Sequence, residues 1–168
     1  MNKHATYQQL RSQLAYLKLS AAAEALPAAL EAAEKTKPGY TQFLCDLFEV
    51  EVEATQERRL ASRLRLAGFP STKTLDEFDF SAQPSLDRRL VSELATLRFI
   101  EERANVLAIG PPGVGKTMLA IALGLKAVHA GYRVYYTTAA DLVARTSRAA
   151  LDGRWQTTMR FWNGPSFL

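Results

Sequence analysis

A glycine-rich stretch at positions 110–117, with the sequence GPPGVGKT, limits the fold of this chain more than any other feature. It matches the pattern G-x-x-x-x-G-K-[S/T] without a gap, and this pattern is typical of loops that hold phosphate groups. The apolar run 104–109 precedes it, and the helix-forming residues 118–126 follow it. Because a strand, a glycine-rich loop and a helix in this order are the usual setting of the pattern, the sequence predicts a P-loop.

The chemistry of phosphate binding accounts for the residue types in this loop. Glycines permit positive φ angles and a close approach of the backbone to a ligand, and successive N–H groups form a concave nest for oxygen atoms. The following helix adds the positive end of its dipole. Lys116 would reach the β- and γ-phosphates, and the Thr117 hydroxyl would bind Mg²⁺. We therefore predict that a nucleoside triphosphate is bound by Gly110, Pro111, Pro112, Gly113, Val114, Gly115, Lys116, Thr117 and Met118.

The residues after the loop predict an α/β fold. Gly131 ends the helix, and residues 132–137 have the composition of a second buried strand. A strand, a helix and a strand imply a right-handed crossover and a parallel sheet. Thr138 and Asp141 then have the spacing of a capping box for a helix through Ala150, so we assign Asp141 a capping role in preference to a catalytic one.

The first seventy residues are predicted to be helical. Leu10, Leu14 and Leu17 recur at helical spacing, Ser20 is placed to cap a second helix, and a third helix runs from residue 42 to about 67. Gly68 and the proline after it end that helix. We expect a helical N-terminal domain at 1–70, a linker and connecting helix at 71–103, and a P-loop domain at 104–168.

The linker contains the acidic and aromatic segment LDEFDF at 75–80. Phe78 and Phe80 alternate, so both can face one surface. Two interpretations stay open, namely packing in the core and lining the entrance to the nucleotide site. Residues 86–100 follow as one amphipathic helix that leads into the P-loop strand.

Composition narrows the class of protein. The net charge of +4 is too mild to require a nucleic-acid partner by itself. There is no run of eighteen apolar residues and no signal peptide, so we expect a cytoplasmic chain without a membrane span. The single cysteine, Cys45, cannot form an internal disulfide, and its apolar neighbours favour a buried structural thiol.

Basic residues gather at the end of the third predicted helix. They complement the helix dipole, which favours a structural role, and they also suit nucleic-acid phosphates. Both interpretations stay open for Arg58, Arg59, Arg63 and Arg65. Further arginines alternate with Trp155, Phe161 and Trp162 near the C-terminus, a mixture that suits nucleic acid or a core.

One part of an ATPase is absent from the sequence. Hydrolysis needs a second apolar strand that ends in the Walker B acid, and no such strand follows residue 137. Two strands are also too few to close an α/β core. We therefore expect an incomplete P-loop domain, truncated at its C-terminal side, with no catalytic residue in this chain.

The chain resembles the IstB-like helper ATPases of bacterial insertion sequences, which are relatives of the DnaC helicase loaders within the AAA+ class. The resemblance extends over nearly the whole sequence. The matching stretches are Arg58-Arg59-Leu60 with Arg63, the segments 75–80 and 105–107, the loop 110–117 with residues 119–124, and the segments 131–134 and 137–142.

This resemblance implies ATP and Mg²⁺ as cofactors and an AAA+-type domain at 104–168. It also implies assembly on duplex DNA, a transposase as partner, homo-oligomers of the full-length form, and DNA contacts by the four arginines of the third helix. Two alternatives remain: a helicase-loader ATPase that acts in replication, and a non-catalytic remnant. A small-molecule kinase is disfavoured because a long helical region precedes the loop.

Overall fold

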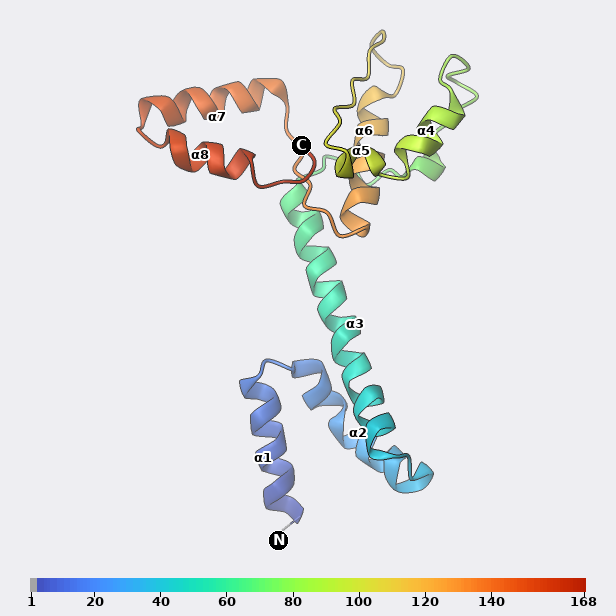
Figure 1. The fold of residues 1–168 in the computed structure, drawn as a ribbon, viewed down its shortest axis with the longest axis vertical. Helices are drawn as coiled ribbons and strands as arrows, with labels where there is room; N and C mark the ends of the chain where they lie inside the picture. The colour runs from blue at the N-terminus through green and yellow to red at the C-terminus, as the bar shows by residue number, and fades with distance from the viewer. Residues whose placement is uncertain (1–2) are drawn as a thin grey trace. The chain divides into compact units, whose positions relative to one another are not determined.

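The computed structural model describes residues 3–168 and divides the chain into two compact units, Met1–Arg59 and Leu60–Leu168 (Figure 1). The long helix α3, Tyr40–Ala67, contributes residues to both units. Each unit has its own hydrophobic core. Within the described residues, no helix combines the length and the apolarity needed to cross a membrane.

The first unit is built from α1 (Lys3–Tyr16), α2 (Ser20–Thr36) and the first part of α3. These helices lie where the helical spacing of the sequence predicts them. Their shared core consists of one or two buried residues from each helix: Leu14, Ala22, Leu26 and Leu47. The predicted stripe on the first helix is buried only in part, because Leu10 and Leu17 are exposed. Cys45 is also exposed, so the prediction of a buried thiol was wrong.

A buried carboxylate joins α2 to α3. Glu51 accepts hydrogen bonds from the backbone N–H of Ala22, at 3.0 Å, and from Nη2 of Arg58, at 2.7 Å. Residue Leu19 precedes α2 and provides no side-chain cap, so Ser20 is not the cap that the sequence predicts. The first N–H groups of a helix have no acceptor within that helix. Glu51, on α3, provides an acceptor for one such group of α2.

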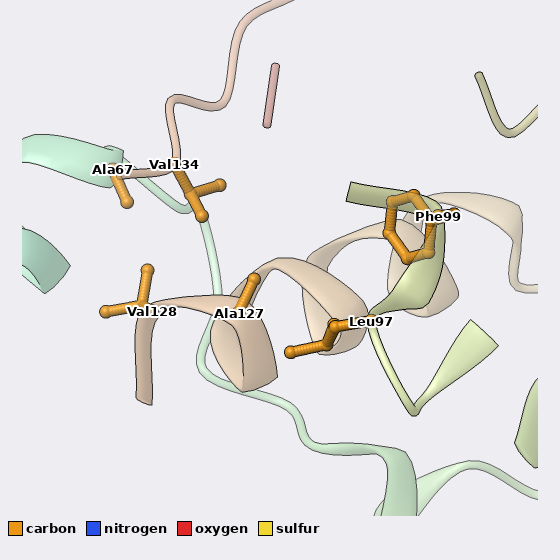
Figure 2. Packing of buried hydrophobic residues seen from close by; sticks show 6 residues of the cluster. All are labelled: Ala67, Leu97, Phe99, Ala127, Val128 and Val134. Atoms are coloured by element: carbon orange, nitrogen blue, oxygen red, sulfur yellow. The ribbon is translucent and has the colours of Figure 1, made fainter. Parts of the chain in front are cut away.

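The second unit is organised around α6 (Lys116–His129), which is apolar on most sides. One cluster of buried residues surrounds the C-terminal half of this helix, and Figure 2 shows Ala67 and Val134 beside Val128, with Leu97 next to Ala127. Gly124 allows a close approach of Phe69 to this helix: a Cβ atom there would lie 2.8 Å from the Phe69 ring.

The connecting segment forms two short helices, α4 (Arg88–Leu94) and α5 (Arg98–Glu101), where the sequence predicts one helix over 86–100. The Asp87 side chain accepts the Arg89 N–H and caps α4. The break follows at Leu97, which has a φ of 64°. The Thr96 hydroxyl donates to the carbonyl oxygen of Glu93 at 2.7 Å, a local bond of the kind that competes with helix continuation.

The predicted α/β parallel sheet was wrong: the described residues contain no strand of a sheet. Residues 104–109 are exposed and have no strand partners, and Leu107 and Ile109 are 82% and 85% exposed. In the second predicted strand, Val134 forms a single parallel bridge to Phe167. The Tyr135 N–H donates to the carbonyl oxygen of Phe167 at 3.1 Å. The two predicted strands therefore do not pair, and the predicted crossover does not form.

The chain ends in a helical hairpin of α7 (Ala139–Leu151) and α8 (Trp155–Trp162), whose helices lie side by side in Figure 1. Thr138 caps the start of α7 at the spacing that the sequence predicts, but Asp141 bonds to the Thr138 hydroxyl and not to its backbone N–H, so the full capping box does not form. The Asp141 N–H donates to Oγ1 of Thr138 at 3.1 Å, and the Thr138 hydroxyl donates to Oδ2 of Asp141 at 2.7 Å.

Candidate functional site

Residues 110–117, called the glycine loop below, form an exposed turn that leads directly into α6. Gly113 has a φ of 82° and Gly115 a φ of 87°, and Gly115 precedes the first residue of the helix. Residues with a Cβ atom rarely adopt such positive φ angles. The two glycines thus allow the backbone to curl tightly at the helix N-terminus, where the first N–H groups have no partner within the helix.

The Lys116 side chain folds back over the glycine loop. Its Nζ donates to the carbonyl oxygens of Gly110, at 2.9 Å, and Pro111, at 2.6 Å. These acceptors are neutral, whereas a phosphate oxygen is charged and forms a stronger bond with an ammonium group. The next residue, Thr117, is exposed.

Phe78 supports the glycine loop from the protein side. An added Cβ atom at Gly115 would lie 2.8 Å from Cε2 of the Phe78 ring, so the ring touches the backbone of the loop. Phe78 is buried and packs with Val91, Leu119 and Leu123. The sequence leaves core packing and lining of the site as alternatives for this residue, and the structure gives it both contacts.

A cavity of about 420 Å³ lies between the glycine loop and α4. Its volume falls within the range of pockets that bind small molecules. The walls are mainly apolar and include Phe78, Leu86, Leu90, Val106, Val114 and Lys116. The site therefore places an apolar pocket next to a cationic group and a helix N-terminus. The α4 residues of the pocket were not predicted, because their helical spacing indicates only an amphipathic helix.

The segment that carries Phe78 is held by short-range bonds. The backbone N–H of Thr74 donates to Oε2 of Glu77 at 2.6 Å, across η1 (Leu75–Glu77). Oδ1 of Asp79 accepts from the hydroxyl and the N–H of Ser81, and these bonds lower the pKa of Asp79 below its usual value. The acids of this segment thus stabilise its own turns.

Few protein groups could act as metal ligands at the glycine loop. Within residues 3–168, no three His, Cys, Asp or Glu side chains gather in a way that could hold a metal ion. A divalent ion at this site would therefore take most of its oxygen ligands from a bound phosphate and from water, as Mg²⁺ commonly does.

The four arginines that the sequence groups together lie on one helix but have different surroundings. Arg58 belongs to the first unit and is bound to Glu51 at 2.7 Å. Arg59 and Arg65 are exposed. Arg63 is half-buried in the second unit and lines a different cavity, together with Arg133 and Arg160. That grouping was not predicted from the sequence, because it joins residues that are far apart in the chain.

Comparison with known proteins assigns a family to these features. Residues 12–166 match the family described as IstB-like ATP binding protein. The chain belongs to this family. ATP is accordingly the ligand that the family supports, and the resemblance seen in the sequence is confirmed.

Curated relatives of this IstB-like chain come from bacterial insertion sequences. It is 41% identical to a candidate ATP-binding protein of insertion sequence IS5376 from Geobacillus stearothermophilus, over 90% of this chain and 61% of the relative. It is 43% identical to the corresponding protein of IS21 from Pseudomonas aeruginosa, over 87% of this chain and 55% of the relative. The chain thus spans about three fifths of the length of these relatives.

Proposed function

We propose that this IstB-like chain binds ATP together with Mg²⁺ at the glycine loop, as part of a helper protein for transposition. The observation that carries the proposal is the geometry of the loop. Two glycines with positive φ precede α6, and the cationic Lys116 side chain folds across the turn. Anions are stabilised at such helix N-termini by the outward N–H groups and by the helix dipole.

The proposed binding step exchanges hydrogen-bond partners. Phosphate oxygens accept from the N–H groups of residues 113–117, and Lys116 transfers its bonds from the two carbonyl oxygens to the β- and γ-phosphates. The Thr117 hydroxyl contributes one ligand to Mg²⁺, and the phosphates contribute others. The apolar cavity that Phe78 and Leu90 line receives the adenine ring of ATP.

Contacts with DNA and a transposase form the wider part of the proposal. The relatives are named for insertion sequences, which supports a transposase as the partner. For the phosphates of duplex DNA we propose Arg59, Arg63 and Arg65 as contacts that position the protein without reading the base sequence. Arg58 is bound to Glu51, so we give it a structural role. Self-assembly of the full-length protein on DNA belongs to the same proposal.

The substitution Lys116→Ala tests the nucleotide site. Titration of a fluorescent ATP analogue with Mg²⁺ should show an affinity roughly ten-fold to hundred-fold lower than that of the unchanged chain, because a charged hydrogen bond of about 1.5–3 kcal/mol is lost. Lys126→Ala is the matched control, since Lys126 is an exposed lysine of the same helix and should leave the affinity unchanged. Equal affinities of the Lys116→Ala variant and the unchanged chain would refute this site.

A further inference from the structure

Another cavity of the second unit, called the arginine groove below, is lined by residues of α3, α8 and the 133–135 segment. Its volume is about 280 Å³. Three arginines and two aromatic residues contribute to its walls, and no acidic residue does. The lining residues are Arg63, Leu66, Arg133, Val134, Tyr135, Arg160, Phe161, Gly164 and Pro165.

The positive charge of the arginine groove is not compensated within the described part of the chain. The ion pairs there involve other arginines, at positions 58, 98 and 154. A fourth guanidinium lies nearby, because Nη1 of Arg145 donates to the Tyr135 hydroxyl at 2.8 Å. Like charges that converge without counter-charges repel one another, so an anionic partner would stabilise this arrangement. Guanidinium groups match phosphate oxygens in geometry and bind them with paired hydrogen bonds.

The aromatic residues that line the arginine groove provide a second feature for ligand recognition. Phe161 is 47% exposed, although its ring meets Tyr135 and Trp162 edge to face at centroid distances of 5.0 and 5.1 Å. Edge-to-face packing fixes the rings while it leaves part of the aromatic surface open. Rings held in this way next to arginines are the components of a stacking platform for nucleotide bases.

We propose that the arginine groove binds single-stranded nucleic acid, with phosphates on Arg63, Arg133 and Arg160 and a base against Phe161. A single strand offers phosphates and unpaired flat bases together, and a hollow with an apolar floor can receive such a base. In a duplex the bases are stacked and paired, so only the phosphates would reach the groove. An acidic peptide matches the charge but lacks the flat rings.

The test is fluorescence anisotropy with a labelled twelve-residue thymidine oligonucleotide, titrated at several salt concentrations. Alanine at Arg63, Arg133 or Arg160 should weaken binding and reduce the slope of log K against log salt by about 0.7 for each arginine removed. Arg89→Ala is the matched control, because this exposed arginine lies on α4 and outside the groove. It should leave both the affinity and the slope unchanged.

Two aromatic variants separate base stacking from charge. Phe161→Leu keeps an apolar side chain, and it should weaken binding roughly ten-fold without a change of the salt slope. Trp155→Leu alters an exposed aromatic residue of the same helix that does not line the groove, and it should have no effect. Circular dichroism of each variant establishes that the helices are retained.

Three results would overturn the inference: an equal loss of affinity for the matching duplex in the Phe161→Leu variant, displacement of the oligonucleotide by an aspartate-rich peptide or by a mononucleotide at equal concentration, and insensitivity of oligonucleotide binding to the groove variants. Titration of the fluorescent ATP analogue is done in parallel. If the chain binds the analogue but not the oligonucleotide, only the arginine-groove proposal is contradicted. If the chain does not bind the analogue, the glycine-loop proposal is contradicted.

Discussion

At the scale of single residues, the contact between Phe78 and Gly115 links the linker segment to the glycine loop. The loop pattern and the alternating phenylalanines are both visible in the sequence, and each is predicted separately. Their contact is not, because it depends on how the 75–80 segment folds back onto α6. Tertiary packing also brings Arg63, Arg133 and Arg160 to one cavity, and local sequence spacing does not predict such a grouping.

Gly115→Ala and Gly113→Ala form a matched pair that measures this contact. Both glycines have positive φ, so an alanine at either position should cost about 1 kcal/mol of backbone strain. A Cβ atom at Gly113 meets nothing within 4 Å, whereas at Gly115 it would lie 2.8 Å from Phe78. Urea unfolding should therefore show Gly115→Ala to be less stable than Gly113→Ala by about 1–3 kcal/mol, as overpacking commonly costs. Equal stabilities would show that Phe78 does not press on the loop.

At the scale of elements, the start of α2 depends on a carboxylate from α3. The bond from the Ala22 N–H, followed by that from Arg58, lowers the pKa of Glu51 below its ordinary value of 4.5. A group whose pKa is lower in the folded state stabilises that state above its unfolded pKa. The contribution is lost as the pH falls below about 4.5 and through the folded pKa.

The substitution Glu51→Gln should remove this contribution. The variant should be less stable than the unchanged chain near pH 7, and the two should converge as the pH falls through the folded pKa of Glu51, because the carboxylate is then protonated. Glu53→Gln, an exposed residue of the same helix, provides the control. The measurement is the urea midpoint of helix loss by circular dichroism, for the intact chain across this pH range. A constant difference between Glu51→Gln and the unchanged chain at all pH values would contradict the role of the ionised group.

Helices of this chain are predictable from its sequence to a greater extent than strands. Apolar spacing and the Thr138–Asp141 pattern are local signals, and the helices and the N-cap at Thr138 follow from them. Residues 104–109 carry the composition of a buried strand, but a strand also requires neighbours for its N–H and C=O groups. Val134 bridges Phe167 instead, so composition alone gives no sheet. The break at Leu97 was also missed, because the side-chain bond of Thr96 lies inside a helical pattern.

At the scale of the whole molecule, exposure of residues 104–109 distinguishes this fold from the predicted sheet. Leu107 is 82% exposed, so Leu107→Ser should change the free energy of unfolding by less than about 0.5 kcal/mol. Leu119→Ser is the buried counterpart on α6, and it should cost about 2–5 kcal/mol because it empties core volume and buries a hydroxyl. Urea unfolding of both variants is the measurement. A large loss of stability for Leu107→Ser would show that this run is buried in solution.

The two units of the chain divide the proposed roles. The glycine loop, the apolar cavity beside it and the arginine groove all lie within Leu60–Leu168. The first unit holds its own core and the Glu51 bonds, and it contains no part of the proposed nucleotide site. The domain boundaries at 1–70, 71–103 and 104–168 stay a prediction.

Hydrogen exchange of the backbone amides tests the central claim most directly, because it locates ATP without any substitution. With ATP and Mg²⁺ present, exchange should slow at residues 110–118, where phosphate oxygens accept the N–H groups, and it should stay unchanged in α1 and α2. Without Mg²⁺ the protection should weaken. Protection confined to other segments, or none at saturating ATP, would contradict nucleotide binding at the glycine loop.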